Sequence, residues 1–357
     1  SRPLQLFHTF TLSPDTTDCV IIGFDRDTEG KRWIFEYPDI KGEPVRTEAR
    51  HINAYLVDAV DVYLDNRKAP LCPSPSINYG SFALDDGHFT LTRDDRDAIL
   101  TSERGASPFL KPFLGAEEML NAKERWCIWL EGAHPSALKK LPEVLRRVEA
   151  VRDWRGSRDR ATTVKLAGTP TLFAERRQPT KSYVAIPTVP SVRRSYLPCT
   201  FLEPEVIASN QLYVMPAASP YHFGIVQSAM HNAWVKYVCG RLKSDFRYSA
   251  SIVYNNFPWP QQATPEQKAA VEAAAQGVLD ARAQFPGSSL ADLYDPLTMP
   301  PALLKAHQAL DKAVDKCYRA QPFTSDAKRV EYLFELYEEY TKGAFAKATA
   351  ARGEKPK

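Results

Sequence analysis

The hydrophobic pattern of the chain changes at Pro258–Pro260, and this change limits the folds that the sequence can adopt. Between residues 157 and 220, short apolar runs alternate with Pro and Ser, which is typical of short strands joined by loops. After Pro260 the apolar residues recur at helical spacing, and Thr264-Pro265-Glu266-Gln267 forms an N-terminal capping box with proline at the first helical position. We therefore predict an α+β chain: a mixed domain of short strands and a few helices, followed by a small C-terminal helical bundle.

Apolar runs and breaker residues place the individual elements. We expect strands at 19–24, 33–37, 125–130, 183–187 and 212–215, the first of them buried and paired with the second. We expect helices at 115–124, 135–154, 221–239, 264–284, 301–319 and 326–348. Gly240 is predicted to be the left-handed cap of the helix that precedes it.

The charge of the chain is unevenly distributed along the sequence. Residues 139–200 contain 14 Lys and Arg against 5 Asp and Glu, whereas residues 1–138 contain 15 against 22. Residues 261–357 are balanced, with 13 of each sign. The basic middle of the chain indicates a surface for a polyanion, with a solvated helix face as the alternative for residues 139–152.

The cysteines argue against a metal site and a disulfide framework. All six lie far apart and form no C-x-x-C motif, at positions 19, 72, 127, 199, 239 and 317. We expect free, buried thiols in a reducing cytoplasm. No apolar run approaches the roughly 20 residues that span a bilayer. Because the start, Ser1-Arg2-Pro3, has neither Met nor a signal region, we expect a piece of a longer chain.

The stretch Tyr254-Asn255-Asn256-Phe257-Pro258-Trp259-Pro260 superficially resembles the Asn-Pro-Pro-aromatic motif of amino-methyltransferases. That motif needs Pro directly after Asn, so that both accept hydrogen bonds from the target amine while the aromatic ring stacks on the flipped base. Here Phe257 separates Asn256 from Pro258, and no G-x-G turn for S-adenosylmethionine occurs. We therefore expect no catalytic residue here, and predict that Phe257 and Trp259 form an apolar clasp and hinge between the mixed domain and the helical bundle.

Longer motifs resemble one known family across nearly the whole chain. The segment "GRLKSDFRYS" at 240–249, followed by "IVYNNFPWP", resembles the end of the target-recognition domain of MmeI-like restriction–modification enzymes. "SLADLYDP" at 289–296 and "AHQALD" at 306–311 resemble the family's C-terminal helical domain. "CVIIGF", "PSINYGSFAL" and "ERWCIWL" extend the resemblance upstream.

The resemblance implies a type II enzyme that joins a nuclease, an adenine-N6 methyltransferase and a recognition domain in one polypeptide. It predicts the trailing edge of the methyltransferase domain and a linker at 1–55, the DNA target-recognition domain at 56–262 and the helical domain at 263–357. The parent enzyme would use S-adenosylmethionine, with Mg²⁺ for nuclease activity. The cofactor-binding and catalytic motifs are missing here, so we expect no cofactor in this fragment and double-stranded DNA and its own methyltransferase domain as partners.

A recognition domain needs phosphate contacts that position it and base contacts that specify the sequence. Basic residues in predicted loops are the candidates for phosphate, and about six to ten such contacts would make binding steeply salt-dependent. They are Arg155, Arg158, Arg160, Lys165, Arg176, Arg177, Lys181, Arg193, Arg194 and Arg247.

The candidates for base readout are Lys243, Asp245 and Asn210. In extended backbone, residues two apart point the same way, so Lys243 and Asp245 could address both halves of one G·C pair. The resemblance implies an opposite-charge pair of this kind in this segment. An Asn amide can pair with adenine, which suits Asn210. The alternatives are a surface ion pair for the first two residues and a turn-forming role for Asn210.

Two other functions remain open at this point. The chain could be a basic interaction or assembly module that binds nucleic acid or protein without reading sequence. It could also be an active methyltransferase, although the absent motifs argue against this.

Overall fold

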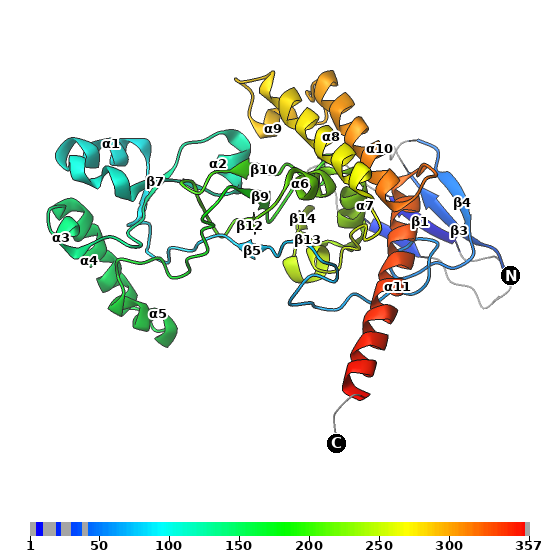
Figure 1. Cartoon of the computed structure of the whole chain (residues 1–357), viewed down its shortest axis with the longest axis horizontal. Helices are drawn as coiled ribbons and strands as arrows, with labels where there is room; N and C mark the ends of the chain where they lie inside the picture. The colour runs from blue at the N-terminus through cyan, green and yellow to red at the C-terminus, as the bar shows by residue number, and fades with distance from the viewer. Residues whose placement is uncertain (1–4, 10–18, 23–29, 38–41, 354–357) are drawn as a thin grey trace.

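The computed structural model of the chain describes residues 5–9, 19–22, 30–37 and 42–353. Strands and helices alternate irregularly before residue 260, and only helices follow (Figure 1). The strands are β1 (Gln5–Thr9), β2 (Cys19–Ile22), β3 (Arg32–Glu36), β4 (Val45–Ala49), β5 (Asn78–Tyr79), β6 (Thr90–Leu91), β7 (Leu110–Leu114), β8 (Trp126–Ile128), β9 (Tyr183–Pro187), β10 (Thr200–Leu202), β11 (Ile207–Ala208), β12 (Leu212–Pro216), β13 (Gly240–Leu242) and β14 (Asp245–Arg247).

The helices confirm the predicted α+β class and the helical C-terminal segment. The α-helices are α1 (Arg93–Ser102), α2 (Ala116–Asn121), α3 (Pro135–Leu138), α4 (Pro142–Gly156), α5 (Ala161–Lys165), α6 (Pro220–Gln227), α7 (Ala229–Val238), α8 (Pro265–Ala283), α9 (Leu290–Leu293), α10 (Pro301–Tyr318) and α11 (Asp326–Gly353). Short turns of other helix types are η1 (Arg104–Phe109), η2 (Leu166–Gly168) and η3 (Ala250–Tyr254).

The N-terminal sheet has the strand order β2-β1-β3-β4. The predicted pairing of β2 with β3 is therefore wrong, because β1 lies between them and pairs with both. β1 was not predicted, although Pro3 precedes it and Ser13-Pro14-Asp15 follows it. The expectation of a fully buried β2 also fails at its end, where Ile22 is exposed; residues 23 and 24 lie outside the described part of the chain.

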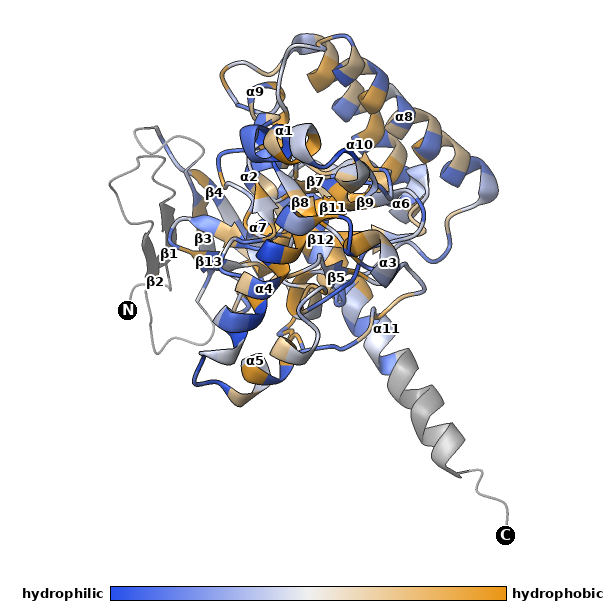
Figure 2. Ribbon diagram, turned by 90° about the vertical axis from the view of Figure 1, so that its left-hand side faces the viewer, coloured by the Kyte–Doolittle hydropathy of each residue, from blue (hydrophilic) through white to orange (hydrophobic). Residues whose placement is uncertain are grey.

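The central sheet, β10-β9-β12-β5, is buried on both faces of its two middle strands. Val184 and Ile186 of β9 belong to the largest apolar core, whereas Tyr183 and Ala185 belong to a smaller core on the opposite face. This explains why both strands read as continuous apolar runs without alternation. Figure 2 shows apolar residues concentrated on these central strands.

A third sheet, β11-β7-β8-β6, forms a separate lobe with α1, α3, α4 and α5 (Figure 1). Its core contains Phe89, Cys127, Ile128, Val144 and Val151, all fully or nearly fully buried. β11 reaches this sheet by pairing in parallel with β7. Since β11 directly precedes β12, the lobe is joined to the central sheet at that point of the chain.

Two predicted helices are each broken into two. Pro142 starts α4 at its first turn, and proline there cannot continue α3. Ser228 has extended backbone between α6 and α7, and its hydroxyl accepts a hydrogen bond from the His231 amide as an N-cap. Gly240 is not a left-handed cap: Cys239 ends α7 in extended backbone and Gly240 begins β13.

The C-terminal helices share their core with the preceding domain instead of forming one of their own. α8 packs against α10 and α6, while α11 packs along α7. Gly224 of α6 allows the close contact, because a Cβ there would lie 2.9 Å from Val271 Cγ1 of α8. One apolar cluster therefore contains Trp234, Val271, Leu310 and Phe334 together.

The segment "NNFPWP" lies at this junction, and the predicted apolar clasp is confirmed. Phe257 and Trp259 are buried, and the ring of Phe257 contacts those of His231 and Trp234. The amide of the fully buried Asn256 donates to the carbonyl oxygens of Asp65, Ser251 and Ile252. Its oxygen accepts from Arg67 Nε at 2.7 Å and from the Tyr337 hydroxyl of α11 at 3.3 Å. Asn256 is therefore a structural residue with every polar atom engaged.

Five cysteines are free and buried, as predicted: Cys72, Cys127, Cys199, Cys239 and Cys317. The side chain of Cys19 lies outside the described part of the structure. Among the described residues, no helix is both long and apolar enough to span a membrane.

Two buried histidines make the stability of this core sensitive to acid. Burial lowers the pKa of His231 and of His307 to about 3, and each Nε2 lies within 3 Å of a tyrosine hydroxyl. The unfolded chain, with ordinary histidine pKa values, takes up protons that the folded chain does not. Each histidine therefore lowers the free energy of unfolding by roughly 1 kcal/mol per pH unit as the pH falls from about 6.5. Asp311, whose pKa burial raises to about 6, acts in the opposite sense and offsets part of this loss.

We expect the free energy of unfolding, measured by urea titration, to fall between about pH 7 and pH 5. The decline should be shallower in His231→Gln and His307→Gln, because each variant removes one titrating group. An equally steep decline in both variants would contradict this assignment.

Candidate nucleic-acid interface

Lys243 and Asp245 lie on the hairpin formed by β13 and β14. Lys243 and Ser244 form its two-residue turn, and Lys243 has a left-handed backbone with φ 54°. Lys243 is exposed, whereas Asp245 is half-buried and its Oδ1 accepts from the Val192 amide at 3.3 Å. The expected extended backbone at Lys243 is therefore wrong. Both residues still lie at the tip of one hairpin.

The hairpin docks on the segment Thr188–Pro190, which directly follows β9. The Tyr248 amide donates to Thr188 O at 2.9 Å, and the Phe246 amide donates to Pro190 O at 3.1 Å. On its other side, Thr188 donates through its amide and its hydroxyl to Gln211 O, at 3.1 and 3.0 Å. Gln211 follows the exposed Asn210 in the turn before β12. One short segment thus holds both predicted base-reading loops side by side.

The same series of contacts continues to two of the predicted phosphate-binding residues. The amide of Ser81 donates to Ala208 O at 2.7 Å, and Ser81 Oγ accepts from the Arg177 amide at 3.1 Å. Gly80 permits this approach, because a Cβ there would lie 2.3 Å from Ser209 O. Arg177 therefore contacts Ser81, and Ser81 contacts Ala208, which lies two residues before Asn210.

Arg155 does not belong to the interface, and its prediction as a phosphate contact is wrong. The side chain is fully buried at the end of α4. Its guanidinium donates to five backbone carbonyls, those of Ala83, Leu84, Leu166, Thr169 and Leu172. Burial lowers the pKa of Arg155. It anchors the loops around η2 to the lobe, a role that charge patterning along the sequence does not reveal.

The other predicted phosphate contacts differ in how available their charges are. Arg176 and Arg177 are exposed but paired with Glu131 and Glu175, at 3.0 and 2.7 Å. Arg194 is half-buried, and burial lowers its pKa while Asp295 and Asp245 oppose that shift. The remaining side chains are exposed: Arg158, Arg160, Lys165, Lys181, Arg193 and Arg247.

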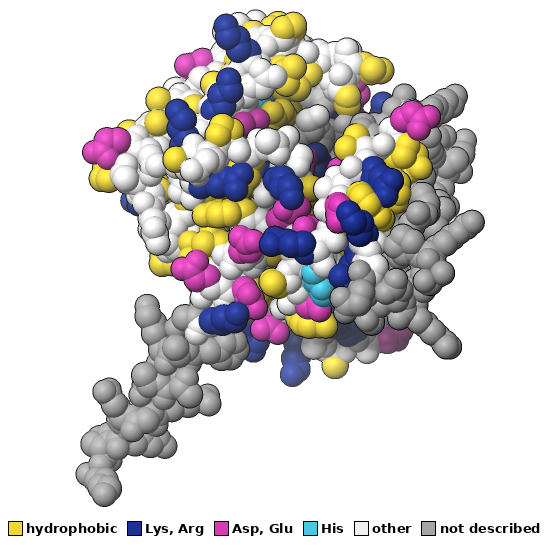
Figure 3. Space-filling model, turned by 90° about the vertical axis from the view of Figure 1, so that its right-hand side faces the viewer, with side chains coloured by type: hydrophobic (Ala, Val, Ile, Leu, Met, Phe, Trp, Pro, Cys, Tyr) yellow, Lys and Arg dark blue, Asp and Glu magenta, His cyan; other side chains and the backbone are white. Residues whose placement is uncertain are grey.

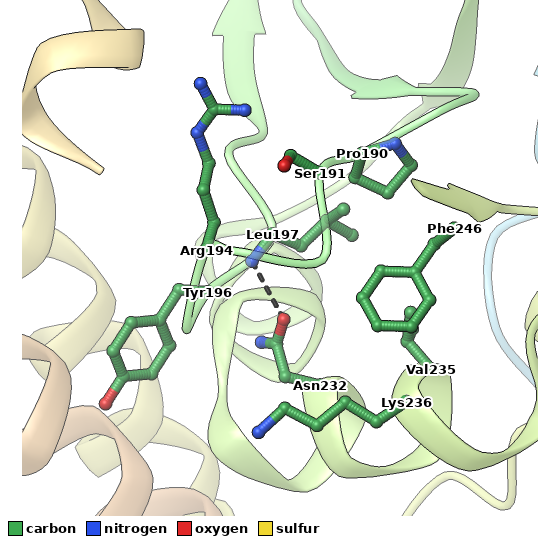
Figure 4. A pocket seen from close by; sticks show the side chains of 9 residues that line it. All are labelled: Pro190, Ser191, Arg194, Tyr196, Leu197, Asn232, Val235, Lys236 and Phe246. Atoms are coloured by element: carbon green, nitrogen blue, oxygen red, sulfur yellow. Dashed lines mark hydrogen bonds between the residues drawn. The ribbon is translucent and has the colours of Figure 1, made fainter. Parts of the chain in front are cut away.

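These residues form a surface and not a pocket. Beneath the hairpin, Pro190, Arg194, Asn232 and Phe246 line a cavity of about 10 Å³, which has room for about one water molecule (Figure 4). No cluster of possible metal ligands occurs among the residues that the structure describes. On the described part of the face at the right of Figure 1, basic and acidic side chains are interspersed (Figure 3).

Comparison with known proteins identifies the family. Residues 58–261 match "MmeI, target recognition domain", and residues 263–345 match "MmeI, C-terminal domain". The chain belongs to the MmeI family. The resemblance inferred from the sequence motifs is thereby confirmed.

Two relatives show how much of such a protein this chain represents. It is 34% identical over 323 residues to "DNA methyltransferase A" of Bacillus subtilis (strain 168), covering 90% of this chain and 36% of that protein. It is 40% identical, with a TM-score of 0.82, to the protein in "Structure of Type IIL restriction-modification enzyme MmeI in complex with DNA has implications for engineering of new specificities". That match covers 95% of this chain and 46% of the other. The chain spans less than half the length of both relatives.

We expect Arg155→Lys to lower the free energy of unfolding by about 3 kcal/mol, because an ammonium group cannot replace a planar guanidinium that satisfies five carbonyls. Arg158→Lys, on the exposed side of the same helix end, is the matched control and should change stability by less than about 0.5 kcal/mol. Urea unfolding measures both. Unchanged stability together with weaker DNA binding in Arg155→Lys would restore the phosphate role.

Proposed function

We propose that this chain is the sequence-reading part of a bacterial type II restriction–modification enzyme that methylates adenine at N6. Its role is to bind the major groove of double-stranded DNA and to place an adenine for flipping into the methyltransferase domain of the same polypeptide. S-adenosylmethionine is the methyl donor of the parent enzyme, and Mg²⁺ serves any nuclease activity. DNA methyltransferases generally use this methyl donor, and a DNA methyltransferase is among the relatives.

The observation that carries this proposal is the attachment of two exposed loops to one short segment. The hairpin that carries Lys243 and Asp245 bonds to Thr188–Pro190 through the amides of Phe246 and Tyr248, and the turn that carries Asn210 bonds to Thr188 through Gln211 O. Lys and Asp offer a donor and an acceptor for a G·C pair, and Asn suits an adenine. Two exposed arginines lie near the hairpin, Arg193 on the adjoining segment and Arg247 on β14, where they can contact phosphates.

The strained turn supports a functional role for Lys243. A left-handed backbone costs a residue with a side chain roughly 1 kcal/mol or more, and Gly is the usual residue at such a hairpin position. A contact between the Lys243 side chain and DNA would offset this cost in the complex. The alternative function is an assembly module that holds nucleic acid or protein without reading sequence. That function does not require a lysine at this position.

The decisive test is selection of bound duplexes from a randomised pool at about physiological salt. Wild type should enrich one sequence, and the exchange Lys243→Glu with Asp245→Arg should change one position of it from G to C or the reverse, because donor and acceptor change places. The matched control is the exchange Lys328→Glu with Glu331→Lys, an ion pair on α11 at 2.6 Å, which should leave the sequence unchanged. If no sequence is enriched although DNA is held, the assembly-module alternative stands.

We also expect Lys243→Gly to separate stability from recognition. Relief of the left-handed strain should raise the free energy of unfolding by up to about 1 kcal/mol. Preference for the selected base over its alternative should fall, because the donor is lost. Urea unfolding and competition binding measure the two effects, and lower stability without loss of preference would show that the turn geometry needs the lysine for structural reasons.

A further inference from the structure

Tyr79 occupies an edge strand beside both predicted base-reading loops. β5, which contains Tyr79, pairs antiparallel with β12, so Tyr79 lies opposite Tyr213. The next two residues, Gly80 and Ser81, bond to Leu212 O and Ala208 O on either side of the Asn210 turn. Tyr213 in turn contacts the ring of Tyr248, the residue that follows β14. Tyr79 therefore lies next to the Asn210 turn. The ring of Tyr213 contacts both Tyr79 and Tyr248, which lies at the base of the hairpin.

The Tyr79 ring is held in place and is still open to solvent. It stacks on Tyr213 with centroids 4.4 Å apart and an angle of 28° between the rings. Burial raises the pKa of Tyr213, and its hydroxyl accepts a hydrogen bond from the Ala250 amide at 3.3 Å. Tyr79 nevertheless keeps 46% of its surface exposed, while Tyr213 keeps 2%. A fixed aromatic ring loses little conformational entropy on binding, which suits it to molecular contact.

Two other exposed apolar side chains belong to the segments that carry the hairpin turn and Tyr79. Leu242, beside the hairpin turn, is 50% exposed, and Phe82, three residues after Tyr79, is 37% exposed. Side chains of this size are normally buried, and a group of them beside exposed arginines matches an interface that combines apolar contact with phosphate binding. The exposed apolar side chains of such an interface would contact an apolar group of the bound DNA.

We propose that Tyr79 is a specificity-determining residue that contacts the C5 methyl group of a thymine in the target site. This inference rests on the proposed function. The thymine methyl is the apolar group that a base pair presents in the major groove, so an aromatic ring among charged and amide readers is suited to it. Tyr79 would thus distinguish a T·A pair by contact, next to positions read by hydrogen bonds.

The experiment uses the sequence that the wild-type chain enriches. Each thymine is replaced singly by deoxyuridine, which lacks only the methyl group, and binding is measured for wild type, Tyr79→Ala and Tyr79→Phe. One replacement should weaken wild-type binding by about fourfold, in line with the loss of one buried methyl. Tyr79→Phe should respond in the same way because it keeps the ring. Tyr79→Ala should bind the thymine site more weakly and be indifferent to that replacement.

Salt dependence and a remote tyrosine provide the controls. Tyr79→Ala should leave the slope of log affinity against log salt unchanged, whereas Arg193→Ala should reduce its magnitude by about one, because only a phosphate contact releases a counterion. Tyr63→Ala removes a tyrosine that is 82% exposed elsewhere and should not alter binding. Should Tyr79→Ala fail to fold, photocrosslinking of wild type to 5-iododeoxyuridine at the sensitive position should label the peptide that contains Tyr79.

The outcomes separate this inference from the proposed function. If a sequence is enriched but every uracil replacement affects wild type and Tyr79→Ala equally, the thymine contact is overturned and sequence reading stands. Labelling of a peptide without Tyr79 overturns it in the same way. If wild type enriches no sequence, both proposals fall together.

Discussion

Burial of strand β9 on both faces is the constraint on which the rest of the structure depends. Its side chains alternate between two apolar cores, so the strand has one register and one position between them. The chain that leaves β9 at Thr188 is fixed by that position. Thr188–Pro190 then bonds to the hairpin on one side and to the Asn210 turn on the other. The placement of the exposed loops therefore follows from the interior of the central sheet.

Local signals in the sequence were sufficient for the fully buried strands and for the long capped helices. β9 was predicted to the residue, and α8 and α10 begin where their proline and capping signals indicate. The breaks at Pro142 and Ser228 were missed, because a continuous apolar stripe conceals a change of helix axis. The position of β1 between β2 and β3 depends on long-range pairing, which has no local signature.

In the candidate interface, too, features with a local signal in the sequence were predicted and features that depend on long-range contacts were not. The basic stretch and the opposite charges of Lys243 and Asp245 were visible in the sequence, because charge is a local property, whereas the hairpin that carries them was not predicted. The role of Arg155 was not, since four of the five carbonyls that it binds belong to loops more than ten residues away. Apart from the Thr188 hydroxyl, the Thr188–Pro190 segment contributes backbone atoms, and backbone bonding leaves no mark in a pattern of side chains. Arg155 and Thr188 show that burial and main-chain geometry decide which residues remain available to a partner.

The shared core of the recognition and C-terminal helices also bears on how such proteins diversify. α8 and α10 complete the burial of α6, and α11 covers α7, so the boundary near Pro260 divides the sequence but not the apolar interior. If the first domain were exchanged between relatives, its helices α6 and α7 would pack against α8, α10 and α11 of another protein. The apolar side chains of the two parts would not have evolved to fit one another. Exchanges at the hairpin tip disturb no such packing, because Lys243 is exposed. Substitutions at loop tips therefore disturb the apolar interior less than recombination at the domain boundary does.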